Sequence, residues 1–124
     1  MKVKNIKIEI QNEKEFVTEV MRDVKQIAKG KDIKKSVVSF ESLKAMRKFI
    51  TDERLRILKT IKKHHPQSIY ELARILGRDT KNVSDDVHYL ADMGLIEIEK
   101  AKTNGREKTT PVVNYEKILL EIAV

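Results

Sequence analysis

The segment from Ser68 to Met93 limits the fold of this chain more than any other part of it. Ser68 and Glu71 stand at the spacing of a capping box, in which a hydroxyl and a carboxylate satisfy N–H groups at the start of a helix. Apolar residues then recur at helical spacing until Gly77, a residue suited to the left-handed end of a helix. The pattern predicts a short helix with this apolar face: Ile69, Leu72, Ala73, Ile75 and Leu76.

A second and longer helix is predicted after the tight connection of Arg78 and Asp79. Asp79 or Thr80 can cap this helix, and Gly94 ends it. At about 100° per residue its inner apolar positions lie within about 60° of one another, and they are Val83, Val87 and Leu90. A short helix, a turn with glycine and a longer helix are typical of the helix-turn-helix, whose second helix enters the major groove of DNA.

A β-hairpin is predicted directly after the longer helix. Asn104 and Gly105 form the dipeptide favoured in a type I′ turn, and the two arms extend over residues 96–102 and 107–113. A hairpin that follows a recognition helix is a wing, which is expected to contact the DNA backbone or the minor groove. Near its turn, over residues 100–108, the wing carries a charge of +3, because four basic residues outweigh Glu107: Lys100, Lys102, Arg106 and Lys108.

Two further helices are predicted upstream of Pro66, which cannot continue a helix. Ser39 can cap the first of them and Thr51 the second. The apolar face of the first is Leu43, Met46, Phe49 and Ile50, and that of the second is Leu55, Leu58 and Ile61.

The N-terminal region predicts a strand followed by a helix. Residues 3–10 alternate between apolar and charged side chains, and a helical apolar pattern extends from Asn12 to Gly30 before a polar connector, residues 31–38. Residues 118–124 alternate more weakly and predict another strand. Because one strand and one helix cannot form a core alone, we expect this region to pack on the rest of the chain or on a second subunit. The apolar face available for a dimer is Ile6, Ile8, Ile10, Phe16, Val20, Val24, Ile118, Leu120 and Ile122.

These patterns together predict an α+β fold, a winged helix-turn-helix with an N-terminal strand-helix extension. Residues 1–36 are the expected packing or dimerisation unit, and residues 37–124 are the expected DNA-binding domain.

A family resemblance points the same way. The stretch from Ser39 to Ile98 contains SFESLKAM, RLRILKTI and SIYELARILGRDTKNVSDDVHYLADMGLIE, and NYEKILLEI follows later. This combination resembles a family of small prokaryotic winged helix proteins, which are transcriptional regulators related to MarR-type and ArsR-type repressors. The resemblance covers roughly three quarters of the chain, and it specifies the fold more than the function, because winged helices also serve as protein-docking modules.

The charge of the chain favours a polyanionic partner. It carries 26 basic and 19 acidic residues, for a net charge of +7, and a basic protein attracts nucleic acid. The excess is uneven, since residues 37–66 carry +5 whereas residues 67–99, which include the predicted recognition helix, carry −4. Because carboxylates repel phosphates, attraction to DNA is expected to come mainly from the wing and the basic helices.

Several other classes of protein are not expected. Cysteine is absent, which excludes disulfides, thiolate zinc sites and cysteine nucleophiles. His64 and His65 are adjacent and would point about 100° apart on a helix, so no metal site is predicted there. Neither a membrane span nor a signal peptide is recognisable, so a cytoplasmic location is expected. Without a nucleophile elbow, a phosphate-binding glycine loop or paired carboxylates in an apolar pocket, we expect neither an enzyme nor a cofactor.

Two groups of residues are the candidate DNA contacts. In the predicted recognition helix, residues 80–93, the positions expected to face base edges are Lys81, Ser84, Asp85 and His88. Those expected near phosphates at its start are Arg78, Thr80 and Asn82. In the predicted wing, residues 96–113, the candidates are Lys100, Lys102, Asn104, Arg106 and Lys108. The alternative interpretations are a solvated helix face and a hairpin whose lysines discourage edge-to-edge pairing.

Two carboxylates of the recognition helix have different expected roles. Asp85 can accept a hydrogen bond from a cytosine amino group, whereas Asp86, closer to the core, is expected to pair with Arg54 or Arg56. The predicted function is sequence-specific binding of double-stranded DNA by a homodimeric transcriptional regulator. The alternative is a non-catalytic module that binds another protein, such as an antitoxin-like module or one that docks on the transcription machinery, and an acidic recognition face would favour it.

Overall fold

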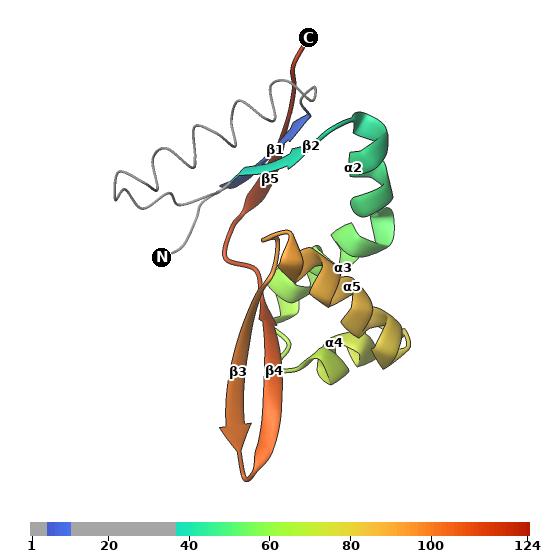
Figure 1. The fold of residues 1–124 in the computed structure, drawn as a ribbon. Coiled ribbons are helices and arrows are strands. Elements are labelled where there is room, and N and C mark those ends of the chain that lie inside the picture. Colours follow the sequence, from blue (N-terminus) through green and yellow to red (C-terminus); the bar gives the residue numbers. More distant parts are fainter. Residues whose placement is uncertain (1–4, 11–36) are drawn as a thin grey trace, which may run out of the picture. The chain divides into compact units, whose positions relative to one another are not determined.

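The computed structural model describes residues 5–10 and 37–124. Helices and strands both occur in these residues (Figure 1), which confirms the α+β class. The predicted helix between Asn12 and Gly30 lies outside the described residues. The elements are β1 (Asn5–Ile10), β2 (Val37–Phe40), α2 (Leu43–Phe49), α3 (Asp52–His64), α4 (Ile69–Leu76), α5 (Thr80–Asp92), β3 (Glu97–Thr103), β4 (Arg106–Val112) and β5 (Lys117–Ile122). Within the described ranges, none of the helices is long and apolar enough to cross a membrane.

The chain divides into two compact units. One, the sheet unit, comprises residues 1–49 and 115–124, and the other, the helix–hairpin unit, comprises residues 50–114. This division differs from the expected boundary after residue 36. The reason is that β2 and β5, one on each side of the helix–hairpin unit in sequence, both pair with β1.

The sheet unit contains a three-stranded parallel sheet in the order β2-β1-β5. Ile8 of the central strand lies beside Val38 on one side and Leu120 on the other. The predicted strands over residues 3–10 and 118–124 are thus confirmed, with β1 and β5 close to those bounds. Ile6 and Ile8 are buried, as their shared face predicts.

The prediction for residues 31–39 was wrong at its C-terminal end. Val37 and Val38 belong to β2 rather than to a connector, and Ser39 pairs with Glu9 in the sheet instead of capping a helix. Ser42 performs that role, because its Oγ accepts a hydrogen bond from the Ala45 N–H at 3.1 Å. The helix it starts, α2, contacts the sheet through Phe49, whose ring centroid lies 5.7 Å from that of Phe40.

In the helix–hairpin unit, local signals place α3 and α4 as predicted. Thr51 caps α3 by accepting from the Arg54 N–H, and Ser68 caps α4 by accepting from the Glu71 N–H. Gly77 ends α4 in the left-handed conformation, with φ of 67°. The buried face of α3 is Ile57, Leu58 and Ile61, so Ile57 takes the place expected for Leu55, which is only half-buried.

The core of this unit forms around α5. Val83, Val87 and Leu90 are each 0% exposed, which confirms the predicted inner face of the helix. Leu72 of α4 and Leu95 after α5 are equally inaccessible to solvent. The following hairpin pairs β3 and β4 antiparallel, from Glu97 opposite Val112 to Thr103 opposite Arg106. Its arms agree with the prediction to within one residue.

The hairpin turn has the backbone that its residues predict. Asn104 and Gly105 both have positive φ, at 55° and 77°, as a type I′ turn requires. Figure 1 shows the β3–β4 hairpin beside the helices of its own unit, with the turn extending beyond them.

Candidate nucleic-acid interface

The start of α5 is fixed by Asp79. Its Oδ2 accepts a hydrogen bond from the Asn82 N–H at 3.1 Å, which caps the helix and satisfies one of its first N–H groups. Lys81 and Asn82 are exposed in this first turn. The end of α4 and the start of α5 are therefore joined by a short turn through Gly77, Arg78 and Asp79.

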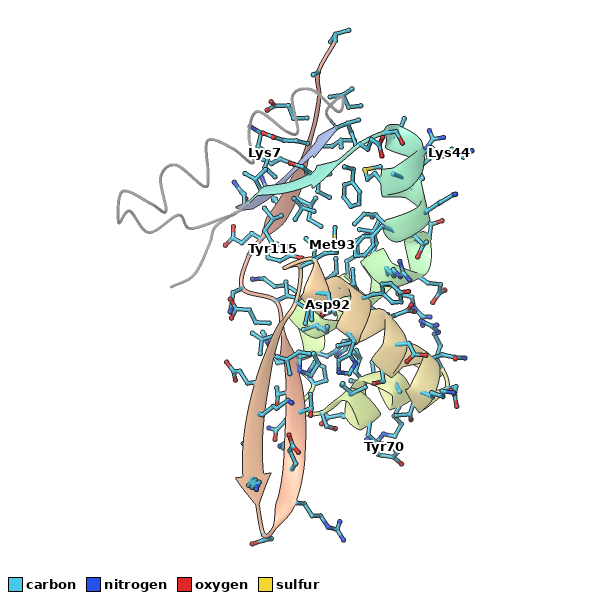
Figure 2. All side chains as sticks on the ribbon, in the orientation of Figure 1. Lys7, Lys44, Tyr70, Asp92, Met93 and Tyr115 are labelled. Atoms are coloured by element: carbon cyan, nitrogen blue, oxygen red, sulfur yellow. The ribbon has the colours of Figure 1, made fainter. Side chains whose placement is uncertain are left out.

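A groove of about 470 Å³ lies between the helices and the hairpin of this unit. One wall is built by the N-terminal turns of α4 and α5, and the other by β4. Most of the groups that line it are hydroxyls or charged groups: Ser68, Ile69, Tyr70, Thr80, Ser84, Arg106, Glu107, Lys108 and Thr109. Tyr70 is 66% exposed and its side chain projects from α4 (Figure 2). The groove therefore offers hydroxyl donors from two helices and cations from the hairpin.

An ion-pair cluster connects α3 to α5. Asp86 binds Arg54 through Oδ1, with Nε 3.3 Å away, and Arg78 through Oδ2, with Nη2 3.2 Å away. Arg78 Nη1 also lies 3.5 Å from Oε2 of Glu53. The Arg54 guanidinium stacks over the Tyr89 ring, 5.0 Å from its centroid. The predicted pairing of Asp86 with Arg54 is confirmed. Arg56 instead donates to the Leu76 carbonyl at the end of α4.

Ser84 and His88 are linked along the outer side of α5. His88 Nδ1 lies 2.7 Å from the Ser84 carbonyl oxygen and 3.3 Å from its Oγ. Because the carbonyl can only accept, Nδ1 carries the proton of this bond, and Nε2 is left as the ring nitrogen available to a ligand. The link fixes the imidazole on the exposed face of the helix.

The hairpin is attached to the α3–α4 connection through Gln67. Lys108 Nζ donates to Oε1 of Gln67, and Thr110 Oγ1 donates to its backbone carbonyl, both at 2.6 Å. On the other strand, Lys100 Nζ lies 3.7 Å from the Glu107 carboxylate. These contacts hold β4 against the start of α4 and so define the width of the groove.

The segment that builds this groove is the one that comparison with known families identifies. A family model described as HVO_A0114 matches residues 49–120, which is more than half of the chain. The chain belongs to the HVO_A0114 family. No curated protein matches the chain. The relation to MarR-type and ArsR-type repressors stays a prediction.

Every predicted DNA contact lies inside the segment matched by the HVO_A0114 model. Four of them line the groove, namely Thr80, Ser84, Arg106 and Lys108. Those exposed on the outer side of α5 are Lys81, Asn82, Asp85 and His88, and those exposed on the hairpin are Lys100, Lys102 and Asn104. Arg78 is held in the ion-pair cluster with Asp86 and Glu53, so its guanidinium serves the joint between helices rather than the groove.

Sequence reasoning missed several groove residues of this HVO_A0114-family chain. Tyr70 is the largest of these residues, and the others that line the groove are Ser68, Ile69, Glu107 and Thr109. An aromatic residue on the polar side of the short helix α4 was the available signal for Tyr70. The contribution of Thr109 depends on how β4 approaches α4, which no local pattern specifies.

The two adjacent histidines do not gather further ligands. His64 ends α3 and His65 follows in the left-handed conformation, with φ of 47°. Within the described residues, no group of three or more His, Cys, Asp or Glu side chains could hold a metal ion.

Proposed function

We propose that this HVO_A0114-family protein is a winged helix-turn-helix regulator of transcription that binds double-stranded DNA. In this proposal α5 is the recognition helix in the major groove and the β3–β4 hairpin is the wing on the backbone or the minor groove. The observation that carries it is the groove between the N-terminal turns of α4 and α5 and the strand β4. The order of helix, turn, helix and hairpin around it supports the proposal, because a helix and a hairpin arranged in this order could contact one duplex together.

The chemistry of the groove suits a sugar-phosphate strand. Phosphate oxygens accept hydrogen bonds from hydroxyls and backbone amides and attract cations. Thr80 and Ser84 supply hydroxyls from α5, while Arg106 and Lys108 supply cations from β4. A DNA backbone strand that runs between the major and minor grooves of the duplex would contact both walls of the protein groove. The base edges would then face the exposed residues of α5: Lys81, Asn82, Asp85 and His88.

The acidic residues of α5 are compatible with this proposal. The charge of Asp86 is compensated by the guanidinium groups of Arg54 and Arg78. Asp92 is the last residue of the helix, at the end opposite the groove residue Thr80. Asp85 remains exposed and could accept a hydrogen bond from a cytosine amino group. The carboxylates of α5 should therefore repel DNA less than their number alone indicates.

Selection of bound sequences from a random pool of DNA duplexes tests the proposal directly. We expect enrichment of a defined motif, with binding that weakens as salt concentration rises. In the double variant Lys102→Ala/Arg106→Ala, the slope of log K against log salt should flatten by up to about 0.9 for each lost phosphate contact. The matched control is Lys44→Ala/Lys48→Ala in α2, which removes the same charge outside the helix–hairpin unit and should flatten the slope less. The absence of any enriched motif would contradict sequence-specific binding.

A second candidate function is docking of another protein on the same unit. Tyr70 and Tyr89 are 66% and 57% exposed, and exposed aromatic side chains are enriched at protein interfaces. Under this alternative, DNA binding would be weak and indifferent to sequence. The double variant in the hairpin would then bind DNA no differently from its α2 control, whereas the regulator proposal requires the two to differ.

A further inference from the structure

We propose that the outer edge of β5 joins two copies of this chain, with β5 of each copy paired antiparallel about a two-fold axis at Leu119. The proposal concerns the sheet unit alone and does not depend on DNA binding. The three-stranded sheets of the two copies would form one continuous sheet across the axis. The edge of each β5 would thus pair with β5 of the second copy.

Among the residues of the sheet unit that the structure describes, the large exposed apolar side chains lie on this strand, apart from that of the last residue, Val124. Leu119, Leu120 and Ile122 are 48%, 50% and 50% exposed. Their neighbours on β1, Ile8 and Ile10, continue the same face as Leu120 and Ile122, and Ile8 is buried. Apolar side chains on both faces of an edge strand lose exposed area when another strand is added beside it.

The centre of β5, between Lys117 and Glu121, also lacks the devices that keep sheet edges from pairing. Proteins protect edges with lysines, prolines, bulges or very short strands. The hairpin has such protection, with Lys100 and Lys102 on β3 and Pro111 on β4. The opposite edge strand β2 has only four residues. In contrast, β5 has six residues with an uncharged centre, Ile118 to Leu120.

The hydrogen-bonding direction of the strand follows from its pairing with β1. The Ala123 N–H donates to the Ile10 carbonyl at 3.4 Å, so the peptide groups of odd-numbered residues face β1. Because peptide groups alternate in direction along a strand, those of Ile118, Leu120 and Ile122 face the outer edge. A second β5 can therefore form backbone hydrogen bonds without any change in the existing sheet.

Symmetry and charge select the register. A two-fold axis perpendicular to the sheet maps each face of the sheet onto itself. Residues directly opposite each other in an antiparallel pair have side chains on the same face. The axis must therefore lie between two copies of the same residue, and not between two different residues. With the axis at Leu119, Lys117 lies opposite the partner's Glu121, and Ile118 lies opposite the partner's Leu120. With the axis at Leu120, Glu121 would instead face an apolar residue, the partner's Leu119. Opposite charges directly across a strand pair are favourable, which selects Leu119 as the centre.

The existing contact of Glu121 is compatible with this register. Its Oε2 binds Lys7 Nζ of the same chain at 2.8 Å. A carboxylate has two oxygens and can accept from two cations, so Lys117 of the partner subunit would add to this pair rather than replace it. The proposal also revises the expected dimer face, because Ile6 and Ile8 are already buried in their own chain. Phe16, Val20 and Val24 lie outside the described residues.

Single cysteines test the register, because the natural chain has none. At the centre of the pair, Leu119 faces its own copy at a Cα–Cα distance of about 4.5–5.5 Å, which a disulfide can span. Leu119→Cys should therefore form a covalent dimer rapidly under mild oxidation. The matched control Leu120→Cys, equally exposed, would place its two Cα atoms beyond the roughly 7 Å that a disulfide allows and should react much more slowly. Equal rates for the two variants, or a faster Leu120→Cys, would overturn the register.

The assembly itself is tested by sedimentation of the full chain without DNA. We expect a dimer at tens of micromolar, and a monomer at that concentration would overturn the proposal. Lys117→Glu would place two like-charged pairs across the axis and should weaken the dimer roughly tenfold, because each such pair changes the association by up to about 1 kcal/mol. Lys102→Glu makes the same charge change on the hairpin and should leave the dimer intact. An equal effect of the two variants would also overturn the proposal.

Discussion

The Nε of Arg54 lies 3.3 Å from Oδ1 of Asp86 and joins α3 to the proposed recognition helix α5. The other carboxylate oxygen of Asp86 binds Arg78, in the turn between α4 and α5. A single side chain thus connects the three helices of the unit, and both partners are mostly shielded from water. The cluster is suited to fixing the angle at which α5 leaves the turn.

Asp86→Ala should lower the free energy of unfolding by about 1–3 kcal/mol, because it leaves two partly buried guanidinium groups without their carboxylate. Asp85→Ala is the matched control, since Asp85 is the adjacent carboxylate on the same helix and is exposed. Its effect should stay within about 0.5 kcal/mol. Urea denaturation of both variants measures the difference. Equal losses would show that the ion pairs contribute nothing to stability.

Val87→Asp should unfold the helix–hairpin unit. Val87 is 0% exposed at the centre of the core, and an unpaired carboxylate there costs several kcal/mol, a large share of the stability of a small domain. His88→Asp introduces the same side chain one position later on the exposed face and should cost less than about 1 kcal/mol. Circular dichroism and thermal melting distinguish the two. A Val87→Asp protein that melts like the natural chain would mean that the helix has a different buried face.

The elements that the sequence predicted best are those with local signals. Ser68 and Asp79 as caps, Gly77 as a helix end, and Asn104 with Gly105 as a turn each act within a few residues, and all four occur as predicted. The strand β2 and the parallel pairing of β5 with β1 could not be read locally, since their partners lie far along the chain. For that reason Ser39 was assigned to a helix cap although it lies in the sheet.

The candidate site was predictable to a similar extent. Helical phase predicted Ser84 on the outer side of α5, and the start of the helix indicated Thr80. The hairpin pattern predicted Lys108 on the second arm and Arg106 directly after the Asn104–Gly105 turn. The attachment of Lys108 to Gln67 joins residues 41 positions apart, so no local pattern indicates it. The same applies to Arg78, whose cationic group was expected near phosphates but is bound by Asp86.

Thr110→Val should loosen the hairpin. The substitution keeps the shape of the side chain but removes the hydroxyl that donates to the Gln67 carbonyl at 2.6 Å, which should cost about 1 kcal/mol. We expect faster hydrogen exchange in β3 and β4 than in the natural chain. Thr109→Val is the adjacent control, because Thr109 lines the groove without that bond. Similar exchange rates in the two variants would show that Gln67 does not hold the hairpin.

Stability at alkaline pH should depend on Tyr115. Burial raises the pKa of its phenol above the ordinary value of 10.0, because the phenolate is poorly solvated inside the protein. At pH values between the pKa of Tyr115 in the unfolded chain and its higher pKa in the folded chain, the unfolded chain loses this proton while the folded chain keeps it. The contribution of Tyr115 is therefore fully present below pH 10 and declines as pH rises beyond it.

The size of this effect follows from linkage and can be isolated with Tyr115→Phe, which removes the titrating group. From pH 9 to pH 11 the natural chain should lose up to about 1.4 kcal/mol of unfolding free energy more than the variant does. Comparing the two by denaturation at both pH values cancels the titration of the lysines, which both proteins share. Tyr70→Phe is the control, since it removes the same hydroxyl from a tyrosine that is largely exposed. If Tyr115→Phe and the natural chain lose stability in parallel, the phenol of Tyr115 ionises as readily in the folded chain as in the unfolded one.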